Sequence, residues 1–158
     1  MGIEKEIGQY TFRNEQQKSI INMVYTYNWM IEKMKNRLDE FELTMQQFNI
    51  LRILRGAKSP LSTMQIRERM LDKMSDTSRI VDRLIVKDLV QKNTCPRDKR
   101  LVDVVITAKG LELLAKLDLH SDELDSIIGN LTCDELQQLN QLLDKMRHTV
   151  ECPAESVS

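Results

Sequence analysis

The sequence has no long apolar run and very few aromatic residues. Its longest apolar runs fall far short of the roughly 20 residues that a membrane-spanning helix needs. The N-terminus also lacks the apolar stretch of a secretory signal peptide, so we expect a cytoplasmic protein without a membrane partner. Aromatic residues make up only 4% of the chain, and nine methionines therefore supply much of its apolar volume.

The sequence is also poor in residues that carry catalysis or bind metals. Its three cysteines, Cys95, Cys133 and Cys152, form no C-x-x-C pair, which favours reduced thiols over a disulfide framework or a zinc ribbon. Its two histidines, His120 and His148, lie in no H-E-x-x-H pattern, and the chain has no glycine-rich phosphate loop. We therefore expect no enzyme, no metal site and no cofactor.

The composition is typical of a helix-rich globular protein. Hydrophobic residues make up 41% and charged residues 30% of the 158 residues, which excludes disorder and fits a single domain with helical extensions. The net charge is -1, but residues 62–100 carry ten lysines and arginines against six acidic residues. A positive block within an otherwise acidic chain indicates that one region meets phosphate.

The stretch from Ser75 to Ile106 combines a helix with a basic hairpin. Apolar residues at helical spacing predict a helix from Ser75 to Lys87, namely Ile80, Val81, Leu84 and Ile85. Arg79 and Arg83 lie on its opposite side. Two β-prone runs follow at residues 89–94 and 101–106, joined by a proline-broken cationic tip at residues 95–100. A helix with an arginine-bearing face followed by a basic hairpin is suited to bind duplex DNA.

Further helices are expected on both sides of this stretch. They cover residues 14–39, 44–55, a short run opened by Pro60 and Ser62 with apolar Met64, Ile66 and Met70, residues 107–128 with a break near His120, and a last helix from Thr132 to about Val150. Capping-box pairs are predicted at Thr44 with Gln47, Ser62 with Gln65, and Thr132 with Glu135. The fold class is therefore mainly α with a small β-hairpin.

The two terminal helical regions are predicted to form a dimer. The helix at 14–39 carries a heptad-like apolar stripe that includes Ile20 and Val24, and additional apolar residues widen it beyond one face. The last helix carries a second stripe, which consists of Leu136, Leu139, Leu143, Met146 and Val150. We divide the chain into an N-terminal dimerisation region (1–40), a DNA-binding domain (41–108), C-terminal dimerisation helices (109–152) and a disordered tail (153–158).

Three motifs resemble one known family. The run from Asp98 to Gly110 is similar to D-x-R-x-x-x-V-x-L-T-x-x-G, with Ile106 in the leucine place; LTMQQFNIL at residues 43–51 is similar to L-T-x-x-Q-F-x-x-L; and SRIVDRL at residues 78–84 is similar to T-R-L-V-D-R-L. These are signatures of the multiple antibiotic resistance regulator (MarR) family of winged-helix repressors, and the resemblance covers residues 15–150. Two residues depart from the pattern: Asp88 stands where the family usually has glycine, and Lys92 replaces an arginine common in the family.

The resemblance implies a DNA-bound winged helix-turn-helix with specific residue roles. The helix from Ser75 would lie in the major groove, with Ser75, Asp76, Thr77 and Ser78 near base edges or phosphates and with Arg79 and Arg83 as longer-reaching donors. Asp76 could instead accept from a cytosine amine, hold one of these arginines, or complement the helix N-terminus. The basic hairpin would be the wing of this fold. At its tip, Arg100 would enter the minor groove, Asp98 would orient it, and Arg97 and Lys99 would contact phosphates.

The expected function is a dimeric transcriptional regulator, a repressor that binds an inverted-repeat operator and is released by a small molecule. A ligand pocket could be lined by Tyr27, Trp29, Met30, Met34 and Phe48, although a Met and aromatic stripe at this spacing also fits an ordinary core. Two alternatives stay open. The winged helix could be a protein-interaction or oligomerisation module without specific DNA readout, or the regulator could respond to oxidation of Cys95 at the wing tip.

Overall fold

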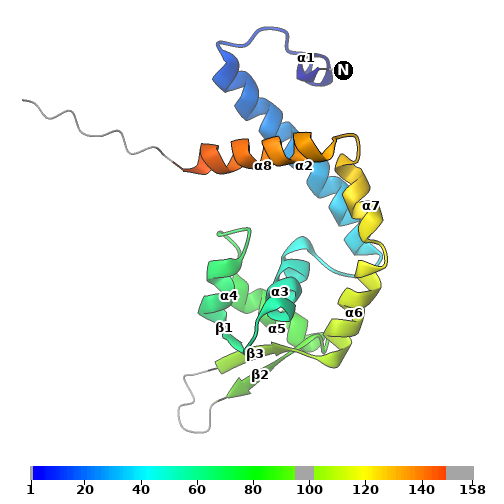
Figure 1. Cartoon of the computed structure of the whole chain (residues 1–158). Coiled ribbons are helices and arrows are strands. Elements are labelled where there is room, and N and C mark those ends of the chain that lie inside the picture. Colours follow the sequence, from blue (N-terminus) through cyan, green and yellow to red (C-terminus); the bar gives the residue numbers. More distant parts are fainter. Residues whose placement is uncertain (1, 95–101, 149–158) are drawn as a thin grey trace, which may run out of the picture. The chain divides into compact units, whose positions relative to one another are not determined.

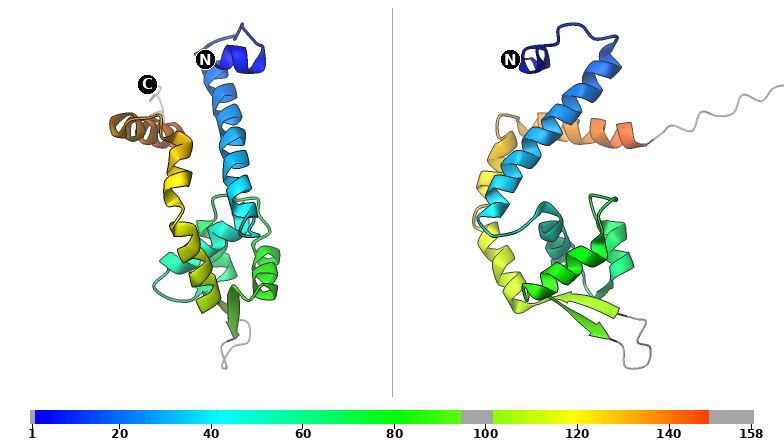
Figure 2. Two further views of the ribbon diagram at one scale, coloured as in Figure 1. Left: turned by 90° about the vertical axis from the view of Figure 1, so that its right-hand side faces the viewer. Right: turned by 180° about the vertical axis from the view of Figure 1, so that it is seen from behind.

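The computed structural model describes residues 2–94 and 102–148. The chain divides into two compact units, residues 1–121 and 122–158. Figures 1 and 2 show the course of the chain in three views, and each unit is treated separately below.

The first unit is built from helices and one small sheet. Its elements in chain order are α1 (Ile3–Ile7), α2 (Glu15–Asp39), α3 (Met45–Gly56), β1 (Leu61–Ser62), α4 (Thr63–Arg69), α5 (Thr77–Val86), β2 (Val90–Thr94), β3 (Val102–Ile106) and α6 (Ala108–Asp118). The helix α7 (Ser121–Asp125) begins at its end, and the second unit continues through the short 3-10 turn η1 (Ser126–Ile128) to α8 (Cys133–Arg147). The predicted fold class, mainly α with a small β element, is confirmed.

The sheet is antiparallel with strand order β1-β3-β2. In the hairpin, Val90 pairs with Ile106 and Thr94 with Val102, whereas β1 pairs Leu61 with Val104 on the other side of β3. In the first unit, Figure 2 shows β2 and β3 side by side at the edge of the unit, next to α5. The hairpin was predicted, but the two-residue strand β1 was not, because a run that short carries no alternating pattern in the sequence.

The core of the first unit lies where α3, α4, α5 and α6 meet the sheet. Ile50, Leu51, Ile66, Val81, Leu84, Val104 and Leu114 are all completely buried there. Leu38 carries the C-terminal end of α2 into the same core. Of the three apolar residues of α4 named from the sequence, Ile66 and Met70 are buried, whereas Met64 is 72% exposed.

Side-chain caps fix where the helices begin. All three predicted capping boxes are present, at Thr44 with Gln47, at Ser62 with Gln65 and at Thr132 with Glu135. Asn14 caps α2 by accepting from Gln17 N at 2.9 Å. The helix α1 was not predicted. It is only five residues long, and its contacts are made with α2, where Glu4 pairs with Lys18 and Tyr25 donates to Glu6.

The turn between α5 and β2 is closed by residues that begin α6. Asp88 has a positive φ of 58°, which few residues other than glycine adopt. Thr107 holds this turn, since its Oγ1 donates to the Asp88 carbonyl at 2.7 Å and also accepts from Gly110 N at 3.1 Å. A methyl group on Gly110 would collide with the Leu89 carbonyl oxygen and would lie 2.7 Å from a side-chain carbon of Ile106. The T-x-x-G spacing therefore reflects a tight packing of α6 against this turn.

The region from 107 to 128 is interrupted as predicted. The helix α6 ends at Asp118, and α7 starts only after Leu119 and His120. In the second unit, α8 begins at its capping box and runs for 15 residues. Leu136 and Leu143 of α8 are half-buried, while Leu139, Leu142 and Met146 are exposed.

Candidate nucleic-acid interface

The helices α4 and α5 with the turn between them form the helix-turn-helix that the sequence predicts. The turn is ordered by the Asp72 carboxylate, which accepts from Met74 N at 3.0 Å. Hydrogen bonding from the Ser75 side chain and from the Met74 backbone lowers the pKa of Asp72, so this carboxylate stays ionised at neutral pH.

The helix α5 begins two residues later than predicted. Thr77 is its first residue, and Asp76 is the N-cap, whose Oδ1 accepts from Arg79 N at 3.2 Å. Ser75 and Asp76 therefore precede the helix instead of forming its first turn. Of the three roles considered for Asp76, the structure shows the contact expected for the complement to the helix N-terminus.

The residues predicted to meet DNA differ in exposure. Asp76, Ser78, Arg79 and Arg83 are exposed, and Ser75 is half-buried. Thr77 is only 3% exposed, so its side chain faces the protein and not the solvent. The exposed side of α5 thus carries the Ser78 hydroxyl and two arginines, with the Asp76 carboxylate directly before the helix.

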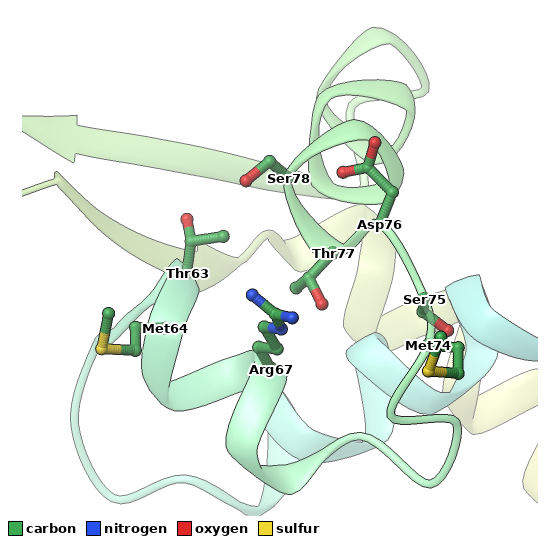
Figure 3. Close-up of a pocket in the computed structure, with 8 residues that line it drawn as sticks. All are labelled: Thr63, Met64, Arg67, Met74, Ser75, Asp76, Thr77 and Ser78. Carbon is green, nitrogen blue, oxygen red and sulfur yellow. The ribbon is translucent and has the colours of Figure 1, made fainter.

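Two recesses flank the start of α5. One, of about 280 Å³, is lined by Arg79 and Arg83 together with Thr44, Gln46, Gln47, Asp72, Ser75, Asp76 and Ile80. The other, of about 470 Å³, lies between α4 and α5 and contains Arg67 (Figure 3). Among residues 2–94 and 102–148, none of the three arginines forms an ion pair with a carboxylate. Their guanidinium groups are therefore available to an external anion.

Arg67 was not predicted as a site residue. From the sequence, only the capping box and the apolar residues of α4 were singled out, and Arg67 was counted only as part of the positive block at residues 62–100. The signal that could have identified Arg67 is its place one position after the buried Ile66, which turns it outward from the same short helix.

The wing is described only in part. Lys92 on β2 forms an ion pair of 2.6 Å with Asp82 on α5, so the strand is tied to the recognition helix. The tip residues Arg97, Asp98, Lys99 and Arg100, and with them Cys95, lie outside the described residues. Their predicted contacts to DNA and the predicted redox role of Cys95 stay predictions.

The residues predicted to line a ligand pocket are spread along α2 and α3. Tyr27 is 58% and Trp29 39% exposed, whereas Met30, Met34 and Phe48 are half-buried. Trp29 lines a recess of about 290 Å³ with Ile3, Glu6, Asn22, Tyr25 and Thr26.

A different recess in the first unit combines apolar and cationic side chains. It has a volume of about 290 Å³ and is lined by Phe41, Glu42, Lys87, Leu89, Lys109, Glu112, Leu113 and Lys116. Lys87 donates to the Glu42 carbonyl and to Gln47 Oε1, and Lys109 donates to the Lys87 carbonyl at 2.8 Å. Because Lys87 is the C-cap of α5, an occupant of this recess would touch the end of the recognition helix.

The residues predicted for dimerisation are largely solvent-facing. Ile20 and Val24 are 58% and 56% exposed on α2, and Leu139 and Met146 are 40% and 55% exposed on α8. Within the described part of the chain, no cluster of three or more His, Cys, Asp or Glu side chains could hold a metal ion. No helix in residues 2–94 and 102–148 is long and apolar enough to cross a membrane.

This chain is similar in sequence and structure to known proteins that contain a helix-turn-helix. Residues 41–101 match the sequence model of the MarR family. The multiple antibiotic resistance protein MarR of Escherichia coli K12 is 29% identical over 128 residues, which cover 74% of this chain and 85% of that protein. The crystal structure of a MarR transcription factor from Planctomyces limnophilus is 31% identical, with a TM-score of 0.65, over 85% of this chain and 98% of that chain. A mutant MarR of E. coli complexed with operator DNA is 26% identical, with a TM-score of 0.70, over 82% of this chain and 92% of that chain. The similarity therefore extends well beyond the helix-turn-helix.

Proposed function

Since this chain belongs to the MarR family of transcriptional regulators, we propose that it is a dimeric repressor that binds an inverted-repeat DNA operator and leaves it when a small ligand binds. The observation that carries this proposal is the pair Arg79 and Arg83. Both are exposed on α5, Arg79 in its first turn and Arg83 in its last turn, and among the described residues neither has a carboxylate partner. Arginine side chains in this position are suited to donate to guanine edges or to phosphates in a major groove.

Dimerisation is supported by the apolar surfaces that each unit leaves exposed. Ile20, Val24 and Tyr27 on α2 and Leu142 on α8 are all more than half exposed. Burying a fully exposed valine, leucine or isoleucine side chain is favourable by about 1.5–3 kcal/mol, so covering these partly exposed side chains would contribute a fraction of that each. Exposed apolar surface on both units supports a second copy of the chain as the partner. A two-fold dimer would bring two copies of α5 to half-sites about one helical turn apart on the DNA.

The recess that contains Phe41 is better supported as the effector-binding site than the residues Tyr27, Trp29, Met30, Met34 and Phe48. Three apolar side chains line it, and its three lysines, Lys87, Lys109 and Lys116, outnumber the carboxylates of Glu42 and Glu112. A small ligand with an apolar body and a carboxylate fits this combination, since the carboxylate could accept from the lysines. Binding at the C-cap of α5 would change the position of the reading helix.

The DNA-binding proposal is tested with the DNA upstream of the gene and of its neighbours. An inverted repeat found there is placed in a labelled duplex and titrated with the protein at several salt concentrations, in the presence of unlabelled bulk DNA. We expect binding that survives the competitor and weakens steeply with salt. Binding that bulk DNA abolishes would favour the interaction-module alternative instead.

The effector proposal needs a separate measurement. Benzoate, as a simple aromatic carboxylate, is titrated into the protein and followed by isothermal calorimetry and by release of the labelled duplex. The variant Lys116→Ala should weaken benzoate binding, whereas Lys58→Ala, an exposed lysine outside the recess, should not. Equal binding by both variants would exclude this recess as the effector site.

A further inference from the structure

The larger of the two recesses that flank the start of α5 contains an arginine, Arg67, that has no role in the proposed function. It has a volume of about 470 Å³ and is lined by Thr63, Met64, Arg67, Met74 and the four residues 75–78. Figure 3 shows Arg67 reaching from α4 toward the beginning of α5, with Met64 and Met74 on opposite sides. We refer to this recess as the Arg67 pocket.

The guanidinium group of Arg67 has no anionic partner among the residues that the structure describes. Arg67 is exposed, and within residues 2–94 and 102–148 it forms no ion pair and no side-chain hydrogen bond. The one carboxylate that lines the pocket belongs to Asp76. Its Oδ1 accepts from Arg79 N, and Figure 3 shows the carboxylate pointing away from Arg67. The planar donor fork of an arginine suits the oxygens of a phosphate.

Thr77 provides a second, independent observation. Its side chain is 97% buried, since only 3% is exposed, and its Oγ1 has no hydrogen-bond partner among the described residues. The hydroxyl points toward Arg67 in Figure 3. A buried hydroxyl without a partner is unfavourable and is uncommon in folded proteins. Arg67 lines the same pocket, and its guanidinium is a donor close to this hydroxyl that no described carboxylate occupies.

The start of α5 adds favourable electrostatics. This helix has ten residues, and Asp76 caps only the N–H of Arg79 with its side chain. The first N–H groups of a helix have no carbonyl partner within it and carry partial positive charge, so the Ser78 end of the pocket also favours an anion.

We propose that the Arg67 pocket is a binding site for one phosphate of the DNA backbone, which the Arg67 guanidinium holds. Thr77 is a positioning residue, because its Oγ1 accepts a hydrogen bond from the same guanidinium while the other N–H groups donate to the phosphate. The 72% exposed Met64 and the 93% exposed Met74 then contact the deoxyribose on either side of that phosphate. This inference rests on the proposed DNA binding and adds α4 to the parts of the chain that contact DNA.

The test compares four variants with the wild-type protein by fluorescence anisotropy on the inverted-repeat duplex and on an unrelated duplex, each at several salt concentrations. Arg67→Ala should weaken binding to both duplexes about tenfold, and it should reduce the slope of log affinity against log salt by about one. Arg69→Ala is the matched control, because Arg69 is exposed on the same helix but does not line the pocket. It should leave the slope unchanged.

Thr77→Val and Arg67→Lys separate positioning from folding. Thr77→Val removes a hydroxyl that has no hydrogen-bond partner in the described part of the chain, so the melting temperature should not fall while DNA affinity falls several-fold. Arg67→Lys should keep the salt slope and lose part of the affinity, because the charge is kept and the fork is lost. The positioning role of Thr77 would be refuted if Thr77→Val lowers the melting temperature and loses only as much DNA affinity as the unfolded fraction explains.

The outcomes distinguish this inference from the proposed function. If the wild-type protein binds neither duplex, the proposed DNA binding fails. If the wild-type protein binds and Arg67→Ala has the same affinity and the same salt slope, the phosphate site is refuted and the proposed DNA binding stands. A loss on the inverted repeat alone would identify Arg67 as a base reader and would overturn the phosphate site. Titration with inorganic phosphate tests whether the pocket binds the free anion instead of DNA. If phosphate binding depends on Arg67 but DNA affinity does not, the proposed contact with the DNA backbone is also refuted.

Discussion

Lys92 Nζ lies 2.6 Å from Asp82 Oδ1, and this ion pair joins the first strand of the hairpin to the recognition helix. Both side chains are partly exposed, at 38% and 62%. An exposed pair of this kind contributes about 0–1 kcal/mol to stability. Its main consequence is geometric, since it fixes the base of the hairpin relative to α5. Lys92 makes one contact where an arginine could make two, which leaves the hairpin less firmly held.

We expect Lys92→Ala to lower the free energy of unfolding by less than about 1 kcal/mol and yet to weaken DNA binding measurably, because the wing loses its fixed position. Lys92→Arg should strengthen binding. Denaturant unfolding and DNA titration check the two effects. A double-mutant cycle with Asp82→Asn assigns them to the pair, and independent effects of the two substitutions would contradict this account.

The positive φ of Asp88 predicts a stabilising substitution. Asp88→Gly should raise the free energy of unfolding by up to about 1 kcal/mol, because glycine adopts this conformation without the steric cost that a Cβ brings. Asp88→Ala should lower it, since alanine has neither the conformational freedom of glycine nor a polar side chain. Thermal unfolding measured side by side checks the order Gly, Asp, Ala, and any other order would contradict it.

The contact between α6 and the α5–β2 turn predicts two destabilising substitutions. Gly110→Ala should cost about 1–3 kcal/mol, because the added methyl group collides with the Leu89 carbonyl oxygen. Thr107→Ala should cost about 0.5–2 kcal/mol, because it removes both the helix cap and the hydrogen bond to the Asp88 carbonyl. Gly56→Ala is the control, since a methyl group there meets nothing within 4 Å. Equal melting temperatures for Gly110→Ala and Gly56→Ala would argue against the close packing.

The cap of α8 predicts a dependence on pH. Hydrogen bonds from the Thr132 backbone and hydroxyl lower the pKa of Glu135 below its ordinary value. A carboxyl with a lowered pKa stabilises the folded state above its unfolded pKa, and this contribution is lost as the pH falls through the folded pKa. Helix content should therefore fall more steeply in acid for the wild type than for Glu135→Gln, which keeps the cap without titrating. Circular dichroism from neutral to acidic pH checks this, and identical profiles would contradict it.

The proposed dimer, with the exposed apolar stripe on α2 in its interface, predicts the effect of a charge at the centre of that stripe. Val24→Glu should shift the protein from dimer to monomer in sedimentation, because a carboxylate buried in an apolar interface without a partner is strongly unfavourable. Ser19→Glu introduces the same charge at an exposed position on a different side of α2 and should leave the dimer intact. A dimer that persists in Val24→Glu would place the interface elsewhere.

The sequence by itself determined the helices that carry their own start signals. Thr44, Ser62 and Thr132 each begin a helix through hydrogen bonds to a residue three positions later, so a short local pattern was enough to predict them. The hairpin followed from two β-prone runs, and the family followed from motifs that are contiguous in the chain. The strand β1 and the helix α1 are too short for such patterns, and their partners lie far away in the sequence.

Only the tertiary structure decided which side chains of the helix-turn-helix face outward. Thr77 and Ser78 are adjacent polar residues, yet Thr77 is buried and Ser78 is exposed, because α5 packs one side against α3 and α4. Arg67 and Arg69 are alike in the sequence, and only the position of α4 beside α5 brings Arg67 to the pocket. Helical periodicity determines which residues share a face, whereas the packing of one helix against another determines what that face meets.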